Sequence, residues 1–424
     1  MANVVYDLTE AFIASTGKFP YYGILRVVEE IAVELYQLDP DLRFVMFSYA
    51  DDAFFEIHPS QSNGRINLNI PQGVKQFHHL RRRHYNKNYI RDALLPLVHR
   101  GIRHINSKSW KRARLDLTEL DMNGKLLVSV GRPKHMVAAL DALERTGARY
   151  DFIPLLHDMF PLHGFTPEDR NRFNLNFIGD NCQVIKRASR IIAISEFTKS
   201  DTQGFSRDGL LPALPEIVTV PLVQECREGN EPPVQHIPDD PYILAVGATL
   251  GRKNIEVVFN ALLLLKEKNA FVPRFVLAGA PRKRVQEYLQ QDRYDSVRSN
   301  VDFIPNPNQT DLVRLYKSAM ALVLPSRIEG WGLPAGEALW TGTPAVCSNI
   351  PVLYEVCGEL GLYFDPNRPD ELAQIIERLH QDTEFSDGLR ARIAREAARL
   401  RTWKDVARDI KKVYDSDISE KVTI

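Results

Sequence analysis

Short apolar runs alternate along this chain with longer stretches in which apolar residues recur every three or four positions. The run Val4–Tyr6 is followed by such a stretch, where Val27, Ile31 and Leu35 mark one face of a helix. Repeated alternation of this kind predicts βα units and a parallel, doubly wound sheet. Because ligands bind outside the carboxyl ends of strands in such sheets, residues that directly follow each apolar run are candidate site residues.

The first half contains five predicted strands: Val4–Tyr6, Phe44–Phe47, Lys125–Val130, Phe152–Leu156 and Arg190–Ile194. Residues at the carboxyl edge of this predicted sheet are Gly23, Gly131, His157 with Asp158, and Ser195. Polar residues and a glycine at that edge indicate a binding surface.

A proline-rich stretch, Pro221–Pro241, separates this half from a second one and is typical of a linker. Five further strands are predicted after it: Tyr242–Val246, Phe275–Ala278, Val301–Ile304, Met320–Leu324 and Pro344–Cys347. A helical tail is expected over Phe385–Tyr414. The chain is therefore expected to be α/β, with two halves of similar construction.

Composition places few limits on function. The 424 residues are 44% hydrophobic and 25% charged, which is ordinary for a globular protein of two or three domains. No apolar run approaches the ~20 residues needed to span a bilayer, and no N-terminal signal segment is apparent. The four cysteines fit neither a zinc motif nor a disulfide framework, so reduced thiols in a reducing cytosol are expected.

Charge is balanced overall, at 54 basic against 54 acidic residues, but not locally. The segment Lys75–Arg114 holds twelve lysines and arginines and one acid, Asp92, interleaved with aromatic and aliphatic residues. Such a segment suits an anionic membrane surface, where Phe77, Tyr85 or Trp110 would lie at the interface. A solvated basic face fits the same pattern, whereas no nucleic-acid motif accompanies it.

The segment Pro325–Glu337 concentrates the candidate chemistry. A strand ends in a loop with two glycines, and Pro334 then occupies the first turn of a helix, whose N-terminal N–H groups suit an anion. Glu329 is expected in the loop and Glu337 within the first turn of the helix, and carboxylates accept hydrogen bonds from the hydroxyls of a sugar or ribose. A turn followed by an acid that the helix dipole favours would produce the same pattern.

The stretch Gly247–Asn254 repeats this arrangement at the first strand of the second half. Arg252 and Lys253 precede a helix there and suit a diphosphate, although an exposed basic loop is the alternative. Neither a dinucleotide-binding glycine motif nor a Walker lysine motif is present. The Asp-x-Asp triples at Asp39 and Asp415 follow predicted helices and are interpreted as surface acids, so no metal site is predicted.

At these residues the sequence resembles the retaining glycosyltransferases of family 4. The hallmark of that family is two glutamates separated by seven residues, here Glu329 and Glu337, around an E-G-[FW]-G-L-P core. Further matches run through Tyr242–Leu379, among them the R-K-N after the first strand and Gly342-Thr343-Pro344. Looser matches in the first half include Gly23–Val27 and Leu156-His157-Asp158.

The resemblance implies a GT-B fold: two facing Rossmann-like domains with a cleft between them and a C-terminal helix that crosses back. It implies an acceptor domain over 1–220, a hinge over 221–240, a nucleotide-sugar domain over 241–400 and a returning helix over 401–424.

The resemblance also implies roles for individual residues. Glu329 and His157 would act at the reacting sugar, and Glu337 would bind the ribose. The diphosphate and sugar would be bound by Arg252, Lys253, Gly247, Gly332 and Leu333, and the acceptor side would include Gly23, Asp158 and Ser195.

The expected reaction is a metal-independent, retaining hexosyl transfer in bacterial O-antigen or capsule synthesis, with no cofactor besides the nucleotide-sugar. GDP-mannose is the expected donor, and dTDP- or UDP-linked sugars such as rhamnose stay open. The expected acceptor is a glycan on undecaprenyl diphosphate, reached by a cytoplasmic enzyme peripheral on the inner face of the plasma membrane. An inactive GT-B binding module is the alternative of a different class.

Overall fold

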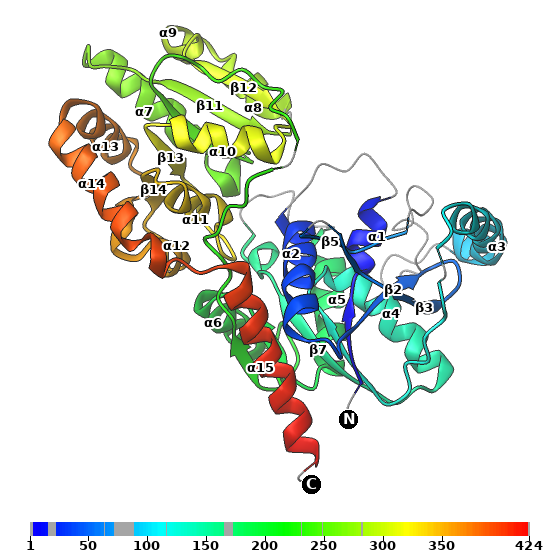
Figure 1. The fold of residues 1–424 in the computed structure, drawn as a ribbon. Helices are drawn as coiled ribbons and strands as arrows, with labels where there is room; N and C mark the ends of the chain where they lie inside the picture. Colours follow the sequence, from blue (N-terminus) through cyan, green and yellow to red (C-terminus); the bar gives the residue numbers. More distant parts are fainter. Residues whose placement is uncertain are drawn as a thin grey trace. The chain divides into compact units, whose positions relative to one another are not determined.

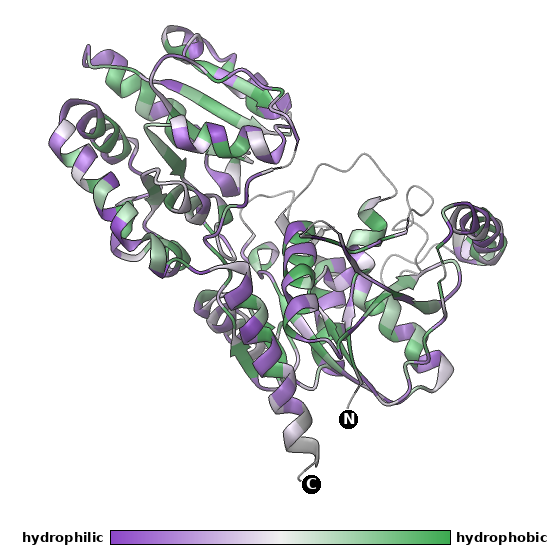
Figure 2. Ribbon diagram, in the orientation of Figure 1, coloured by the Kyte–Doolittle hydropathy of each residue, from purple (hydrophilic) through white to green (hydrophobic). Residues whose placement is uncertain are grey.

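The computed structural model describes residues 3–15, 23–62, 64–71, 89–115, 117–164, 173–229, 231–247, 249–280 and 283–422. These residues form two units, one made of 1–221 with 403–424 and the other of 222–402 (Figure 1). Both units are α/β, and the strands at their centres are predominantly hydrophobic (Figure 2). The expected α/β architecture is confirmed.

The first unit is built on a seven-stranded sheet in the order β3-β2-β1-β6-β7-β8-β9. All neighbouring pairs are parallel except β2 with β3. The strands are β1 (Asn3–Asp7), β2 (Arg43–Ser48), β3 (Ala53–Ile57), β6 (Lys125–Ser129), β7 (Tyr150–Leu156), β8 (Ile191–Ala193) and β9 (Ile217–Thr219). The antiparallel edge strand β3, and the small hairpin of β4 (Ser60–Ser62) and β5 (Arg65–Asn67), were not predicted.

The helices of this unit are α1 (Thr9–Ser15), α2 (Gly23–Leu38), α3 (Tyr89–Arg112), α4 (Pro133–Thr146), α5 (Phe173–Arg187), α6 (Glu196–Arg207) and α15 (Trp403–Val422). The last of these, α15, packs on α2, where the Arg26 guanidinium lies 5.9 Å from the centre of the buried Trp403 ring. Tyr414 adds a hydrogen bond of 2.7 Å to Asp39.

The second unit is a six-stranded, wholly parallel sheet in the order β12-β11-β10-β13-β14-β15. Its strands are β10 (Tyr242–Val246), β11 (Arg274–Gly279), β12 (Val301–Pro305), β13 (Ala321–Leu324), β14 (Ala345–Ser348) and β15 (Leu362–Phe364). Its helices are α7 (Glu256–Glu267), α8 (Lys283–Leu289), α9 (Asp295–Arg298), α10 (Gln309–Ser318), α11 (Leu333–Trp340), α12 (Pro351–Cys357), α13 (Pro369–Gln381) and α14 (Thr383–Glu396).

Strand order fixes where a ligand can bind in each unit. In the second sheet the direction of winding reverses between β10 and β13, and in the first it reverses between β1 and β6. Loops that leave such a pair of strands diverge to opposite faces and open a crevice at the carboxyl edge. In the second unit this brings the stretch after β10 close to the stretch after β13. In the first unit it brings the stretch after β1 close to the stretch after β6.

The helical tail predicted over Phe385–Tyr414 is confirmed, but it is divided into α14 and α15. The division lies near Arg401, whose backbone N–H and C=O bond to Gln224 instead of continuing a helix. The interpretation of the second Asp-x-Asp triple was wrong. The acids of the second Asp-x-Asp triple lie inside α15 and do not follow it, and Asp417 is buried.

The proline-rich segment after Pro221 contains no helix or strand among its described residues, yet it is fastened to the second unit. The Asp311 carboxylate accepts hydrogen bonds from the backbone N–H groups of Val234 (3.0 Å) and Gln235 (3.1 Å). Asn308 donates to the carbonyl of Pro232 at 2.9 Å. The segment therefore belongs structurally to the second unit, and its role as a hinge stays a prediction.

Candidate active site

The carboxylate of Glu329 is the centre of the polar cluster in the second unit. Glu329 lies in the loop after β13, and its side chain is 10% exposed. It accepts hydrogen bonds from Lys253 Nζ at 2.5 Å, Ser326 Oγ at 2.6 Å and Arg252 Nη1 at 3.2 Å. Two strand-end loops that are far apart in sequence thus meet at one carboxylate, as the switch between β10 and β13 requires.

The charge state of Glu329 follows from these partners. Burial raises the pKa of the carboxyl, but the positive charges of Lys253 and Arg252, with hydrogen bonds from Lys253 and Ser326, outweigh burial and lower the pKa to about 2. Glu329 is therefore an anion at neutral pH. Three formal charges at this site, two positive and one negative, leave a net positive charge for an anionic ligand.

The basic residues of this cluster are fixed by backbone contacts as well. Arg252 and Lys253 lie in a single 3-10 turn, Gly251–Lys253, which ends at Asn254 in the left-handed region. Arg252 Nη1 also donates to the carbonyl of Ile328 at 2.9 Å. Asn254 is almost fully buried and donates to the carbonyl of Pro366 at 2.8 Å. The cations are consequently presented from a braced turn and not from a loose loop.

The glycine-bearing loop Glu329–Gly332 is anchored by its tryptophan. Trp331 is buried, and its indole N–H donates to the carbonyl of Val223 at 2.9 Å. Gly332 then caps α11 with a φ of 102°, and a Cβ at this position would lie 2.7 Å from Leu353 Cδ2. Only glycine fits this turn, which brings the N-terminus of α11, with Leu333 as its first residue, to the edge of the sheet.

Glu337 lies beyond the first turn of α11, contrary to the sequence prediction, because the helix begins at Leu333, and it is held there by a different partner. It is 3% exposed and accepts a hydrogen bond of 2.6 Å from the hydroxyl of Tyr316, which lies on α10. The two glutamates of the motif are thus placed by separate elements and contact different groups. Gly247, the remaining predicted donor-side residue, follows β10 with a φ of 68° and donates its N–H to Ala278 at 2.9 Å.

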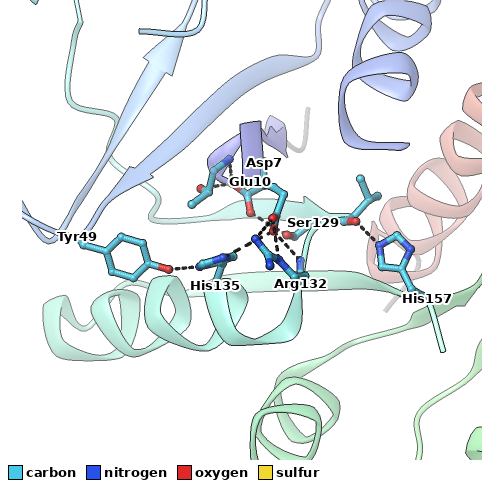
Figure 3. Close-up of polar contacts among 9 residues, drawn as sticks. Asp7, Glu10, Tyr49, Ser129, Arg132, His135 and His157 are labelled. Atoms are coloured by element: carbon cyan, nitrogen blue, oxygen red, sulfur yellow. Dashed lines mark hydrogen bonds and ion pairs between the residues drawn. The ribbon is translucent and has the colours of Figure 1, made fainter. Parts of the chain in front are cut away.

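A second polar cluster lies at the corresponding switch point of the first unit (Figure 3). Glu10 of α1 is buried, and Arg132 at the start of α4 donates to it through its backbone N–H at 3.1 Å and through Nε at 2.8 Å. Asp7 at the end of β1 accepts from Ser129 Oγ at 2.7 Å, and burial raises the pKa of the Asp7 carboxyl. This cluster was not predicted, although Gly131 was placed at this edge.

His157 follows β7 and is half-buried beside this cluster. Its Nε2 lies 2.7 Å from the carbonyl of Val130, and because a carbonyl only accepts, Nε2 must carry the proton. Burial lowers the pKa of the imidazole. A neutral ring with its proton on Nε2 has its lone pair on Nδ1, so His157 can accept a hydrogen bond from a ligand hydroxyl.

The other residues predicted on the acceptor side occupy simpler positions. Ser195 caps α6: its hydroxyl accepts from the backbone N–H of Thr198 at 2.9 Å and is fully buried, so the local structure already accounts for it. Gly23 is the exposed first residue of α2, and Asp158 is half-buried after His157. Contacts of these residues with a ligand stay predictions.

Comparison with known proteins assigns the second unit. Residues 227–400 match the family model described as "Glycosyl transferases group 1". The chain carries a glycosyltransferase group 1 domain. This domain contains Arg252, Lys253, Glu329 and Glu337, so the cluster around Glu329 lies wholly within it.

Proteins named as O-antigen chain mannosyltransferases and as D-inositol 3-phosphate glycosyltransferases are among those to which this chain is similar. The chain is 30% identical over 243 residues to "O-antigen chain mannosyltransferase B" of Escherichia coli, a match that covers 54% of this chain and 62% of that protein. The aligned segment is thus shorter than two thirds of the relative.

Solved structures show the fold of the whole chain. The sucrose-phosphate synthase of Thermosynechococcus elongatus aligns with 99% of this chain and all of its own, with a TM-score of 0.66 and 16% identity. Anabaena HepE, solved in complex with UDP, aligns with 98% of this chain and all of its own, with a TM-score of 0.56 and 14% identity. The expected GT-B fold is confirmed, with the group 1 domain as its second Rossmann-like unit.

Proposed function

We propose that this chain is a retaining hexosyltransferase that moves mannose from GDP-mannose to a growing surface glycan. The observation that carries the proposal is the buried Glu329 carboxylate between Lys253 and Arg252, at the strand switch of a glycosyltransferase group 1 domain. Cations, a helix N-terminus and a fixed carboxylate at one edge suit a ligand that is both a diphosphate and a sugar. The mannosyltransferase relative supports mannose as the sugar.

The reaction breaks the bond between the sugar C1 and the leaving diphosphate oxygen, and forms a bond from C1 to an acceptor hydroxyl oxygen. The acceptor proton passes to the departing phosphate oxygen on the same face, so configuration is retained and no separate general base is needed. Arg252, Lys253 and the N-terminus of α11 neutralise the developing charge on the diphosphate. Glu329 stabilises the positive charge that develops at the sugar.

Glu337 and His157 have binding roles in this scheme. Glu337 accepts hydrogen bonds from the ribose hydroxyls, and His157 accepts one from a hydroxyl of the reacting sugar through Nδ1. Gly247, Gly332 and Leu333 let the donor approach the backbone closely. Closure of the two units about the segment after Pro221 would exclude water and limit hydrolysis of the donor.

We further propose that the acceptor is a glycan on undecaprenyl diphosphate. The enzyme would then work at the cytoplasmic, inner face of the plasma membrane as a peripheral protein. Within the described residues no helix is both long and apolar enough to cross a membrane.

The test is a thermal-shift screen of GDP-mannose, dTDP-rhamnose and UDP-linked hexoses, followed by transfer assays and linkage analysis of the product. GDP-mannose should raise the melting temperature most and alone support transfer. Preference for dTDP-rhamnose or a UDP-sugar would replace the donor assignment. Donor binding with neither transfer nor hydrolysis would indicate an inactive binding module.

A further inference from the structure

Helix α3 presents two opposite apolar faces, and the body of the first unit covers only one of them. On the inner face Leu95, Ile102 and Trp110 are buried. The Trp110 ring lies with its centre 6.3 Å from that of Phe12 and 5.7 Å from that of Phe55 on β3. These contacts fix the rotation of the helix and therefore determine which residues point outward. Figure 1 shows α3 at the margin of the unit, beside β3.

The outer face carries large apolar side chains that are exposed. Ile90 is 77% exposed, Leu94 52%, Leu97 70% and Ile105 55%. At about 100° per residue these four positions fall in a stripe on one side of the helix, within about 80° of one another, and the buried side chains lie on the other side. Isolated exposed apolar residues are ordinary, but several on one side of a helix mark a surface that contacts a partner or a membrane, and here Gly101 and His104 lie on that side between Leu97 and Ile105.

Cations surround and continue this stripe. Arg100 flanks it, and Lys108 and Arg112 prolong it toward the end of the helix; all three are exposed. Arg103 is turned toward the body of the unit, where it pairs with Asp51 at 3.1 Å. Asp92 is the only acid in the sequence of α3 and is half-buried. The outward surface therefore combines apolar area with positive charge.

We propose that α3 lies in the interfacial plane of an anionic membrane, with the stripe Ile90, Leu94, Leu97 and Ile105 inserted among the acyl chains. The cations of its last turns then contact lipid phosphates. A second copy of the chain is a poorer occupant, because pairing two such helices would bring their cations together without acids to offset them. An anionic lipid surface matches both the apolar and the charged part of the face.

This assignment differs from what the sequence suggested. Trp110 was expected at the membrane interface, and that expectation was wrong because Trp110 is buried against the first unit. Phe77 and Tyr85, the other two residues expected at the interface, lie outside the described residues, as do Arg81, Arg82 and Arg83 of the same basic segment. The proposed membrane-binding surface is the outward stripe of α3, which lies within the predicted basic segment Lys75–Arg114.

The proposal deepens the proposed function, since it names the surface by which the enzyme reaches a lipid-linked acceptor. Its test uses vesicle binding without any donor, so failure of vesicle binding and failure of transfer are separate results. The full chain is sedimented with vesicles of phosphatidylcholine alone and of phosphatidylcholine with phosphatidylglycerol, at low and at physiological salt. Binding is expected only to the anionic vesicles and should weaken as salt rises.

Two outward leucines provide the decisive variants. Leu94→Gln and Leu97→Gln should each lower the affinity for anionic vesicles about tenfold, because each removes one inserted side chain. Leu210→Gln is the matched control, since Leu210 is 47% exposed in the same unit but lies outside α3. Unchanged melting temperatures would show that the variants are folded, and vesicle binding equal to that of the wild type would overturn the proposal.

A double substitution of two cations on α3 tests the electrostatic part of membrane binding. Lys108→Gln with Arg112→Gln should weaken binding to anionic vesicles and reduce its salt dependence. Lys266→Gln with Lys268→Gln removes as many exposed charges from the second unit and should have no effect. If Leu97→Gln abolished a concentration-dependent dimer while vesicle binding stayed intact, the stripe would be a protein interface and the membrane proposal would be wrong.

Discussion

Lys253 Nζ lies 2.5 Å from Glu329 Oε1, although the two residues belong to loops that follow different strands of the second sheet. The first unit contains a counterpart at its own switch point, where Arg132 Nη2 lies 2.5 Å from Glu10 Oε1. In the first unit the carboxylate of Glu10 follows β1 and the cation follows β6. In the second unit the order is reversed, because Lys253 follows β10 and the carboxylate follows β13. Each Rossmann-like unit therefore joins its two diverging loops by an ion pair.

The ion pair at Glu329 should make the free energy of unfolding depend on pH. Because the pKa of this carboxyl is lowered to about 2 from its ordinary 4.5, the native state favours the anion. The resulting contribution is complete above pH 4.5 and is lost as the pH falls toward 2, with a size of about 3 kcal/mol. The measurement is the free energy of unfolding of the wild type and of Glu329→Gln across this range. Their difference should shrink on acidification, and a constant difference would contradict the ion pair.

The two glutamates should fail in different ways. Glu329→Ala should mainly lower kcat, because this carboxylate acts where charge develops, whereas Glu337→Ala should mainly raise KM for the donor. Each lost hydrogen bond is expected to cost about 1–3 kcal/mol. Tyr316→Phe removes one partner of Glu337 and should reproduce a weaker form of its effect. Wild-type kinetics in both glutamate variants would remove the basis for the site.

The requirement for glycine at the start of α11 can be tested by comparing Gly332 with Gly342, which has a similar backbone conformation. Gly332→Ala combines a left-handed φ of 102° with a clash at Leu353, and it should destabilise the protein and weaken donor binding. Gly342→Ala has a φ of 82° but open space around the new Cβ, so it carries only the conformational cost of about 1–2 kcal/mol. Thermal unfolding of both variants should place Gly332→Ala well below Gly342→Ala. Equal losses would mean that the close approach at Gly332 is relieved at no cost.

Substitutions in the first unit should affect the acceptor. Arg132→Ala removes the hydrogen bonds from its side chain to Glu10 and loosens the loop after β6, in the unit that we propose binds the acceptor. We expect KM for the acceptor to rise while binding of the nucleotide-sugar, measured by thermal shift, is unchanged. Arg43→Ala breaks a partly buried ion pair with Glu56, between β2 and the edge strand β3 of the same sheet, and serves as the control. An altered donor affinity in Arg132→Ala would assign this cluster to the donor instead.

Transfer should not depend on a divalent metal. The described residues contain no group of three His, Cys, Asp or Glu side chains placed to bind one, and Arg252 and Lys253 can neutralise a diphosphate instead. The measurement is hexosyl transfer after EDTA treatment, with and without added magnesium. Activity lost with EDTA and restored by magnesium would show that a cation is required.

Local sequence determined most of the fold and the donor half of the candidate site. The apolar run Tyr242–Val246 has the same bounds as strand β10, and the helix expected around Pro334 is α11, Leu333–Trp340. Both could be predicted because a buried parallel strand is a continuous apolar run, and a proline in the first turn marks the start of a helix. The motif around Glu329 was visible for the same reason: its glycines, tryptophan and glutamates are consecutive.

Tertiary structure alone decided which side chains meet and which faces stay exposed. The pairs Lys253–Glu329 and Glu10–Arg132 depend on strand order, which brings together loops that are distant in the chain. In the same way, the charge count of Lys75–Arg114 could not say which side of α3 is buried. A helix with two apolar faces can bury either of them. In α3 the packing of Trp110 against Phe12 and Phe55 buries one face, and Leu94 and Leu97 are therefore exposed on the other.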